Sequence, residues 1–393
     1  MNESMLVYFG VAALVMRLGT ALYLSGMCRA KNAGGAMFRI VADLLVTIIA
    51  VWAVGDALFS GDKGLLFGWS RTDPALAMII AVTLIATGII VGAASERSRF
   101  LPMMLVAAVT AAVVVPLGWR WAWGWMNRDM GFIDIGGASF THCAGAVIGL
   151  VAIKFVGPRL GKYNHDGSSN VVPGHNIPLA AAGVLIAAIG FFPYILGCAA
   201  MRGDTSASRI VADALCAAAA GGLAGMLLGW FRFSPGDTYL TYCGFLGGLV
   251  AVSGCAGRID TLAAVAIGAV AGVLVPVMSI KLELQFKMDD PSAKVAIHGV
   301  GGALGTLAAG LSLTGHGVLG RIEQVGHQLL GLLVITALAA AIGTVTFFIL
   351  TRVTVLHLRE ADEFDGVDLS EHDLNSYPDF QQTMIKSYHL RES

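Results

Sequence analysis

Asp134-Ile-Gly-Gly-Ala-Ser-Phe-Thr-His142-Cys-Ala-Gly145 opens one apolar segment of this chain, and Asp290-Pro-Ser-Ala-Lys-Val-Ala-Ile-His298-Gly-Val-Gly301 opens another. Each stretch has an aspartate at its start, a histidine eight residues later and a glycine three residues beyond the histidine. Because an α-helix rises 1.5 Å per residue, each histidine should lie about 12 Å along its helix. If the two segments enter from opposite faces, they form an inverted repeat, and both histidines reach the centre of a bilayer about 30 Å thick.

The composition is that of an integral membrane protein. Hydrophobic residues make up 56% of the 393 positions and charged residues only 13%, and the mean hydropathy is +0.75. Soluble domains carry about a quarter charged residues. The net charge of −1 offers no basic face to phosphates, so nucleic-acid binding is excluded together with soluble enzymes and disordered proteins.

We predict an all-α polytopic fold, since each span needs about 20 apolar residues and the chain has material for several. The sequence has eleven apolar segments, and this odd number puts the two termini on opposite sides of the membrane. Lysine and arginine are more frequent in the loops of one side, which the positive-inside rule assigns to the cytoplasm together with the C-terminal tail. The N-terminus is then outside. The eleven predicted spans are 5–28, 38–59, 74–95, 101–121, 135–156, 177–200, 208–230, 239–256, 261–281, 295–313 and 326–356.

The chain divides into a membrane domain and a polar tail. The tail contains Pro378, followed by good helix formers, which is typical of the start of a new helix. We expect either a short cytoplasmic helix here or a connector toward another domain. The predicted divisions are a membrane domain over 1–357, repeat halves of about 5–156 and 177–313, a last span at 326–356, and the tail at 358–393.

Two histidines inside membrane spans indicate a functional site, although satisfied structural polar residues are the alternative. Neither His142 nor His298 has a ligand partner at helical spacing, and the six cysteines form no CxxC pair, so we expect no metal and no cofactor. Neutral imidazoles offer an N–H donor and a lone pair, which suits a small hydrogen-bonding solute and proton exchange. A second polar feature is Arg17 in the first span, for which Asp43 is a candidate partner.

At these residues the chain resembles the ammonium transporter family (the Amt/Mep/Rh group), and the resemblance extends over nearly the whole sequence. The resemblance implies a homotrimer with one pore in each eleven-helix protomer. It matches His142 and His298 to the twin histidines of the pore and Asp134 to the acidic residue that organises the outer ammonium site. The matching motifs are Gly19-Thr-Ala-Leu-Tyr23, Gly92-Ala-Ala-Ser-Glu96-Arg97, Gly157-Pro158-Arg159, His175-Asn176-Ile177-Pro178, Asp289-Asp290-Pro291 and the tail Asp365-Gly366-Val367-Asp368-Leu369-Ser370-Glu371-His372.

The sequence departs from the family pattern around the outer site. The family's paired phenylalanine constriction aligns to Val82 and Tyr194, and a hydroxyl that lies near bound ammonium aligns to Cys198. Valine has no π face, and a thiol is a weaker hydrogen-bonding group than a hydroxyl. Trp123 is the aromatic residue that we expect to hold a cation by its π face. Recruitment of ammonium should therefore be altered.

Two functions follow from the resemblance, and neither is an enzyme activity. One is transport of ammonium or ammonia across the cell membrane through the twin-histidine pore. The other is ammonium sensing with little or no transport, as in relatives that are fused to a histidine kinase or a diguanylate cyclase. The tail would then bind a cytoplasmic regulatory protein or lead to a fused signalling domain, which the continuation past Tyr377 favours.

Overall fold

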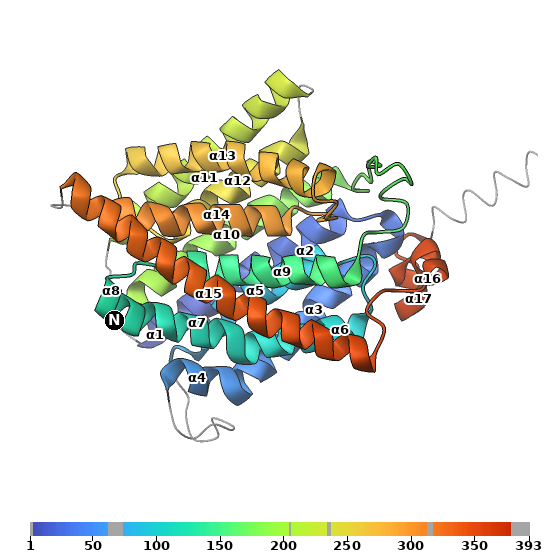
Figure 1. Ribbon diagram of the computed structural model, residues 1–393, viewed down its shortest axis with the longest axis horizontal. Coiled ribbons are helices and arrows are strands. Elements are labelled where there is room, and N and C mark those ends of the chain that lie inside the picture. The colour runs from blue at the N-terminus through green and yellow to red at the C-terminus, as the bar shows by residue number, and fades with distance from the viewer. Residues whose placement is uncertain (1–2, 62–73, 204–205, 234–236, 313–316, 379–393) are drawn as a thin grey trace, which may run out of the picture.

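The computed structural model describes residues 3–61, 74–203, 206–233, 237–312 and 317–378, and every regular element in these ranges is helical. Most of the long helices run along the horizontal direction of Figure 1, and two short helices of the tail lie at one end of the bundle. We call that end the tail side. The predicted all-α membrane architecture is therefore confirmed.

Ten helical stretches of the described chain are long and apolar enough to cross a membrane. The remaining predicted span, 239–256, falls on the 16-residue helix α12, which is shorter than those ten stretches, so a count of eleven stays a prediction. Three short π-helical turns interrupt the spans, at Val51–Gly55, Thr110–Val114 and Ala138–Cys143. The helices are α1 Glu3–Ala13, α2 Val15–Met27, α3 Ala33–Ala50, α4 Asp56–Ser60, α5 Leu76–Ala93, α6 Phe100–Val109, α7 Val115–Trp123, α8 Trp125–Met130, α9 Ala144–Val156, α10 Ile177–Met201, α11 Ala207–Arg232, α12 Thr238–Ser253, α13 Thr261–Leu284, α14 Lys294–Leu311, α15 Val318–Val353, α16 Glu360–Asp365 and α17 Val367–His372.

The helices that carry the two histidines run in opposite directions. Arg159, just after the end of α9, forms an ion pair of 2.8 Å with Asp289, just before the start of α14. At the other end, a Cβ on Gly302 of α14 would lie 2.5 Å from the carbonyl oxygen of Ala138, which precedes α9. The two segments therefore enter from opposite ends of the bundle, as the sequence predicts.

The last long helix begins earlier than predicted, at Val318 instead of residue 326. Its first turns contain Gln324 and Gln328, which are polar but buried. The Gln324 amide donates to the carbonyl of Gly131 and the Gln328 amide to that of Ile133, at 2.7 and 2.6 Å. Because backbone carbonyls satisfy these buried amides, the helix begins before the apolar segment does.

The buried arginine of the first span has the partner that the sequence predicts. Arg17 forms an ion pair with Asp43 of α3, and both side chains are buried. Thr87 of α5 donates its hydroxyl to the same carboxylate at 3.1 Å. Gly88 leaves the space for the guanidinium, because a Cβ there would collide with it.

The tail is held against the tail side by hydrogen bonds to backbone and side chains. The Asp368 carboxylate accepts from the N–H groups of Gly34 and Gly35, at 3.0 and 2.7 Å, in the first turn of α3. Glu371 forms an ion pair with the buried Arg39. The helix predicted after Pro378 lies almost wholly outside the described residues.

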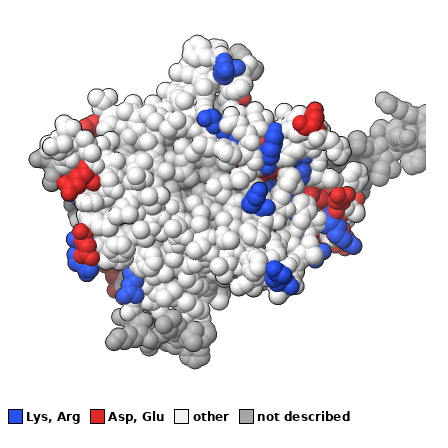
Figure 2. Space-filling view, in the orientation of Figure 1, with Lys and Arg blue, Asp and Glu red and all other residues white. Residues whose placement is uncertain are grey.

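The surface of the molecule separates charged ends from an apolar middle. Figure 2 shows a broad face with few charged side chains, which gather at its left end and over its right half, with a few more toward the top. Large apolar residues such as Leu185, Leu262 and Leu333 are exposed on the helices between those ends. Exposed apolar side chains over such an area are suited to contact with lipid.

Candidate functional site

His142 lies in the π-helical turn Ala138–Cys143 that precedes α9. Asp134 fixes this turn, because its carboxylate accepts from the N–H groups of Ala138 and Ser139 and from the Ser139 hydroxyl, at 2.8, 2.8 and 2.6 Å. The carboxylate is completely buried. Its ligands are therefore the backbone and hydroxyl donors of the turn that presents His142.

The two histidines are in direct contact. Their Nδ1 atoms are 2.9 Å apart, and the ring planes differ by only 3°. One Nδ1 must donate a proton and the other must accept it, so the pair in this geometry has complementary tautomers. The resulting unit can accept a proton on one outer nitrogen and release one from the other, which suits proton exchange with a small solute.

His298 lies one turn into α14, and an aspartate fixes the start of this helix as well. The Asp290 carboxylate accepts from the N–H groups of Val295 and Ala296, at 2.8 and 3.3 Å. Ala293, which lies between Asp290 and Val295 in the sequence, has a φ of 51° in the left-handed region. The aspartate of each repeated motif thus caps the helical turn that leads to its histidine.

Trp123 and Asp134 are adjacent on the side opposite the tail. The Trp123 indole N–H donates to the Asp134 carbonyl oxygen at 2.7 Å. The guanidinium of Arg202, just after α10, lies 5.2 Å from the centre of the Trp123 ring. A cation from the protein itself thus already occupies a π face that the sequence assigned to the substrate.

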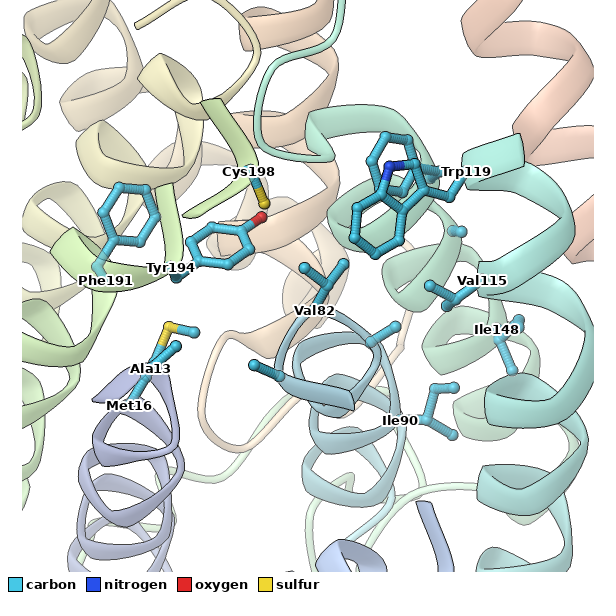
Figure 3. Close-up of a cluster of buried hydrophobic side chains, with 14 of the residues drawn as sticks. Ala13, Met16, Val82, Ile90, Val115, Trp119, Ile148, Phe191, Tyr194 and Cys198 are labelled. Carbon is cyan, nitrogen blue, oxygen red and sulfur yellow. The ribbon is translucent and has the colours of Figure 1, made fainter. Parts of the chain in front are cut away.

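Val82, Tyr194 and Cys198 are fully buried between the outer end and the histidines. Figure 3 shows the Tyr194 hydroxyl directed toward the Cys198 sulfur, with Val82 on the facing helix. The hydroxyl donates to the Gly136 carbonyl oxygen and lies 3.5 Å from Nε2 of His142. Tyr194 therefore lies next to His142, on the side away from the tail. The sequence predicts Tyr194 in the constriction but not its contact with His142.

Two cavities of about 40 Å³ each adjoin the histidines toward the tail side. Each is large enough for a water or an ammonium ion. Both are lined by Lys294 and His298; one also contacts Arg17, and the other contacts His142 and Tyr23. Sequence reasoning missed Lys294 and Tyr23 as site residues, although Lys294 precedes His298 by four residues and so shares its helix face.

Charged groups on the tail side join the pathway helices to the tail. Arg159 bridges Asp289 and Glu96, at 2.8 and 2.7 Å, and Arg29 connects Glu96 to Glu363 of α16. Burial opposes the ionisation of Glu96, but the Arg159 and Arg29 guanidiniums outweigh it and lower the pKa of this carboxyl. This network carries the contact between α5, the end of α9 and the tail.

The chain is similar to ammonium transporters along almost its whole length. It is 30% identical to the ammonium transporter Amt2 of Archaeoglobus fulgidus, over 94% of this chain and 87% of that protein. It is 28% identical to the ammonium transporter Amt1 of Haloferax mediterranei, over 96% of this chain and 78% of that one.

Solved structures agree with this assignment. A sensor Amt protein is 28% identical and superposes with a TM-score of 0.88, covering 95% of this chain and 98% of that chain. Mep2 of Saccharomyces cerevisiae is 22% identical and superposes with a TM-score of 0.79. The superposition covers 92% of this chain and 88% of the Mep2 chain, and it shows that the two share a fold. The model of the Ammonium Transporter Family matches residues 4–377. The chain belongs to the ammonium transporter family.

Proposed function

We propose that this protein recognises ammonium from the side opposite the tail and brings it to the pair His142–His298 for passage across the membrane. The observation that carries the proposal is the 2.9 Å contact between the two Nδ1 atoms. A bare cation is very costly in apolar surroundings, so a pathway lowers the barrier if it separates a proton from ammonium at a hydrogen-bonding site. The histidine pair provides both the donor and the acceptor for that step.

The outer part of the site follows from the same idea. Trp123 offers its ring to a cation, Asp134 holds the turn that carries His142, and Tyr194 lies between the outer end and that histidine. Val82 and Cys198, both fully buried, add a small apolar and a weakly polar group near Tyr194. We propose that these residues determine which solutes reach the histidines.

We also propose how the protein is arranged in the membrane. The tail side faces the cytoplasm of a cell membrane and the N-terminus lies outside, and three copies form a homotrimer with one pathway in each protomer. Residues 1–357 form the membrane domain and 358–393 the tail, which binds a regulatory protein or leads to a signalling domain.

A second candidate function is ammonium sensing. Its support is the similarity to a sensor Amt protein over 95% of this chain, at a TM-score of 0.88. A sensor needs ammonium to bind one conformation more tightly than another, and it does not need net transport. The docked tail would respond to such a change in the membrane helices, because Asp368 and Glu371 bond directly to α3.

The test is to measure ammonium binding by calorimetry and ammonium-evoked current in proteoliposomes, with His142→Ala beside the wild type. Saturable binding that is lost in the variant supports recognition by the pair, and a saturable current that is lost with it supports transport. Binding without current supports the sensor. His165→Ala is the matched control, since His165 is an exposed loop residue. Unchanged binding in His142→Ala would overturn the proposal.

A further inference from the structure

Lys294 places a positively charged side chain within the pathway, on the tail side of the histidines. It is the first residue of α14 and precedes His298 by one helical turn. The side chain is buried, with 3% of its surface exposed, and it lines both cavities that adjoin the histidines. In the proposed function, a solute that leaves the histidines through either cavity meets this amine.

The position of the lysine is fixed by its neighbours. Its aliphatic stem crosses α5 at Gly92, where a Cβ would lie 3.2 Å from Cγ of the lysine. Its amine lies 5.4 Å from the centre of the Tyr23 ring. The ring is held in turn by the Tyr23 hydroxyl, which donates to the Ser292 carbonyl oxygen at 3.1 Å. Tyr23 therefore presents its π face to a cation that is covalently part of the protein.

No residue of the described ranges neutralises this cation at close range. Among the residues that the structure describes, the Lys294 amine makes neither a hydrogen bond nor an ion pair. Asp290 attracts it, but one oxygen of that carboxylate is engaged by the start of α14, and Arg17 adds repulsion. The first turn of a helix is also the end where the helix dipole disfavours a positive charge.

A charge in such a place is costly, and charged residues within membrane spans usually serve a function. Packing alone would be achieved by an apolar side chain of the same length, without the loss of solvation. The amine also resembles the substrate, because both are –NH₃⁺ type cations that bind an aromatic face. The position of Lys294 is thus the position that ammonium would take after it passes the histidines.

We propose that Lys294 is a tethered substitute for ammonium that closes the tail-side half of the pathway to the charged substrate. Its amine occupies the Tyr23 face and repels a second cation on the tail side of the histidine pair. Neutral ammonia is not repelled by the charge. This inference rests on the proposed recognition of ammonium by the histidine pair, and it favours the second candidate function, sensing with little conduction of ammonium ions.

The experiment compares ammonium-evoked currents of proteoliposomes that hold the wild type, Lys294→Met or Lys294→Arg. Methionine keeps the length and removes the charge, so the current should rise at least about tenfold. Arginine keeps the charge, and its current should stay at the wild-type level. Lys281→Met, at an exposed lysine near the end of α13, is the matched control and should also match the wild type.

Calorimetry on the same samples separates this inference from the function on which it rests. If ammonium binds to both proteins and Lys294→Met conducts no more than the wild type, the closure by Lys294 is overturned while recognition stands. If neither protein binds ammonium, the proposed function itself fails. Lys294→Gln serves as a second neutral variant if the methionine variant does not elute as a folded protein, and it must raise the current in the same way.

Discussion

The guanidinium of Arg202 lies 5.2 Å from the centre of the Trp123 ring. A cation over an indole face is worth about 0.5–1 kcal/mol at an exposed site. Ammonium must therefore compete with this arginine for the ring, and it also meets the repulsion of a like charge nearby. In the function that we propose, the outer site is weakened by a residue that follows α10.

Replacing Arg202 by glutamine should strengthen ammonium binding, because the substitution frees the ring and removes the like charge. We expect the Kd measured by calorimetry to fall about two- to fivefold, the factor that corresponds to one cation–π contact. Arg209→Gln is the control, since Arg209 is exposed at the start of α11 on the same side. A Kd that rises in Arg202→Gln would mean that the arginine supports the site.

Replacing Asp134 by alanine should abolish ammonium binding and lower the stability of the protein. Three hydrogen bonds to the turn of His142 are lost, and the unsatisfied buried donors cost about 1–3 kcal/mol each before relaxation. Thermal unfolding and calorimetry measure the two effects. Asp260→Ala removes a comparable helix cap from α13, where the carboxylate accepts from Ala263, and it should leave binding intact. Retained binding in Asp134→Ala would remove Asp134 from the site.

Replacing Val82 by phenylalanine should narrow the approach to the histidines. Val82 is fully buried, so the larger ring also overpacks its surroundings at a cost of about 1–3 kcal/mol. We expect slower ammonium passage and a lower Tm, measured by liposome flux and thermal unfolding. Val265→Phe, at a partly exposed position of α13, is the control for added size. An unchanged flux and binding profile would show that Val82 does not belong to the constriction.

The contact between His357 and Glu363 should make tail docking depend on pH. Both ring nitrogens of His357 face acceptors, the Glu363 carboxylate at 3.0 Å and the Val156 carbonyl oxygen at 2.7 Å. The hydrogen bond to Glu363 raises the pKa of His357 above 6.5. For Glu363, burial opposes ionisation, but hydrogen bonds from His357, Leu160 and Arg29 outweigh it and lower the pKa below 4.5.

His357 and Glu363 stabilise the docked tail over different pH ranges. The contribution of His357 is fully present below 6.5 and is lost as the pH rises through its raised pKa, whereas that of Glu363 is lost as the pH falls through its lowered pKa. The protection factor of the α16 amides, which corrects the exchange rate for the intrinsic pH dependence of amide exchange, should therefore be highest between these limits and lower at about pH 8.5. In His357→Gln the loss of protection on the alkaline side should disappear, and a loss that persists would assign the dependence to another group.

The sequence predicts the histidine contact because a repeated pattern sets the depth of each histidine along its helix. The Arg17–Asp43 pair is predictable for a similar reason, since a buried charge in a span needs a partner in a neighbouring span. In each case one polar residue in an apolar segment is a strong local signal. The family motifs then supply the order of the remaining helices.

Other contacts could not be predicted because they join residues with no common local pattern. The approach of Arg202 to Trp123 depends on how the end of α10 packs near α7. That of Lys294 to Tyr23 joins the first span to a helix late in the chain. The early start of α15 depends on carbonyls of a distant loop that satisfy Gln324 and Gln328. Such relationships follow from tertiary packing alone.

The carboxylates of the tail also act as counter-ions for arginines that the membrane helices bury. Arg39 is almost completely buried, with 1% of its surface exposed, and the acid with which it pairs is Glu371. A chain shortened before α16 would keep every apolar helix and still lose this neutralisation. The buried guanidinium would then recruit water or move toward it, which disturbs α3. The minimal stable unit of this protein is thus set by charge balance and extends beyond its last apolar helix.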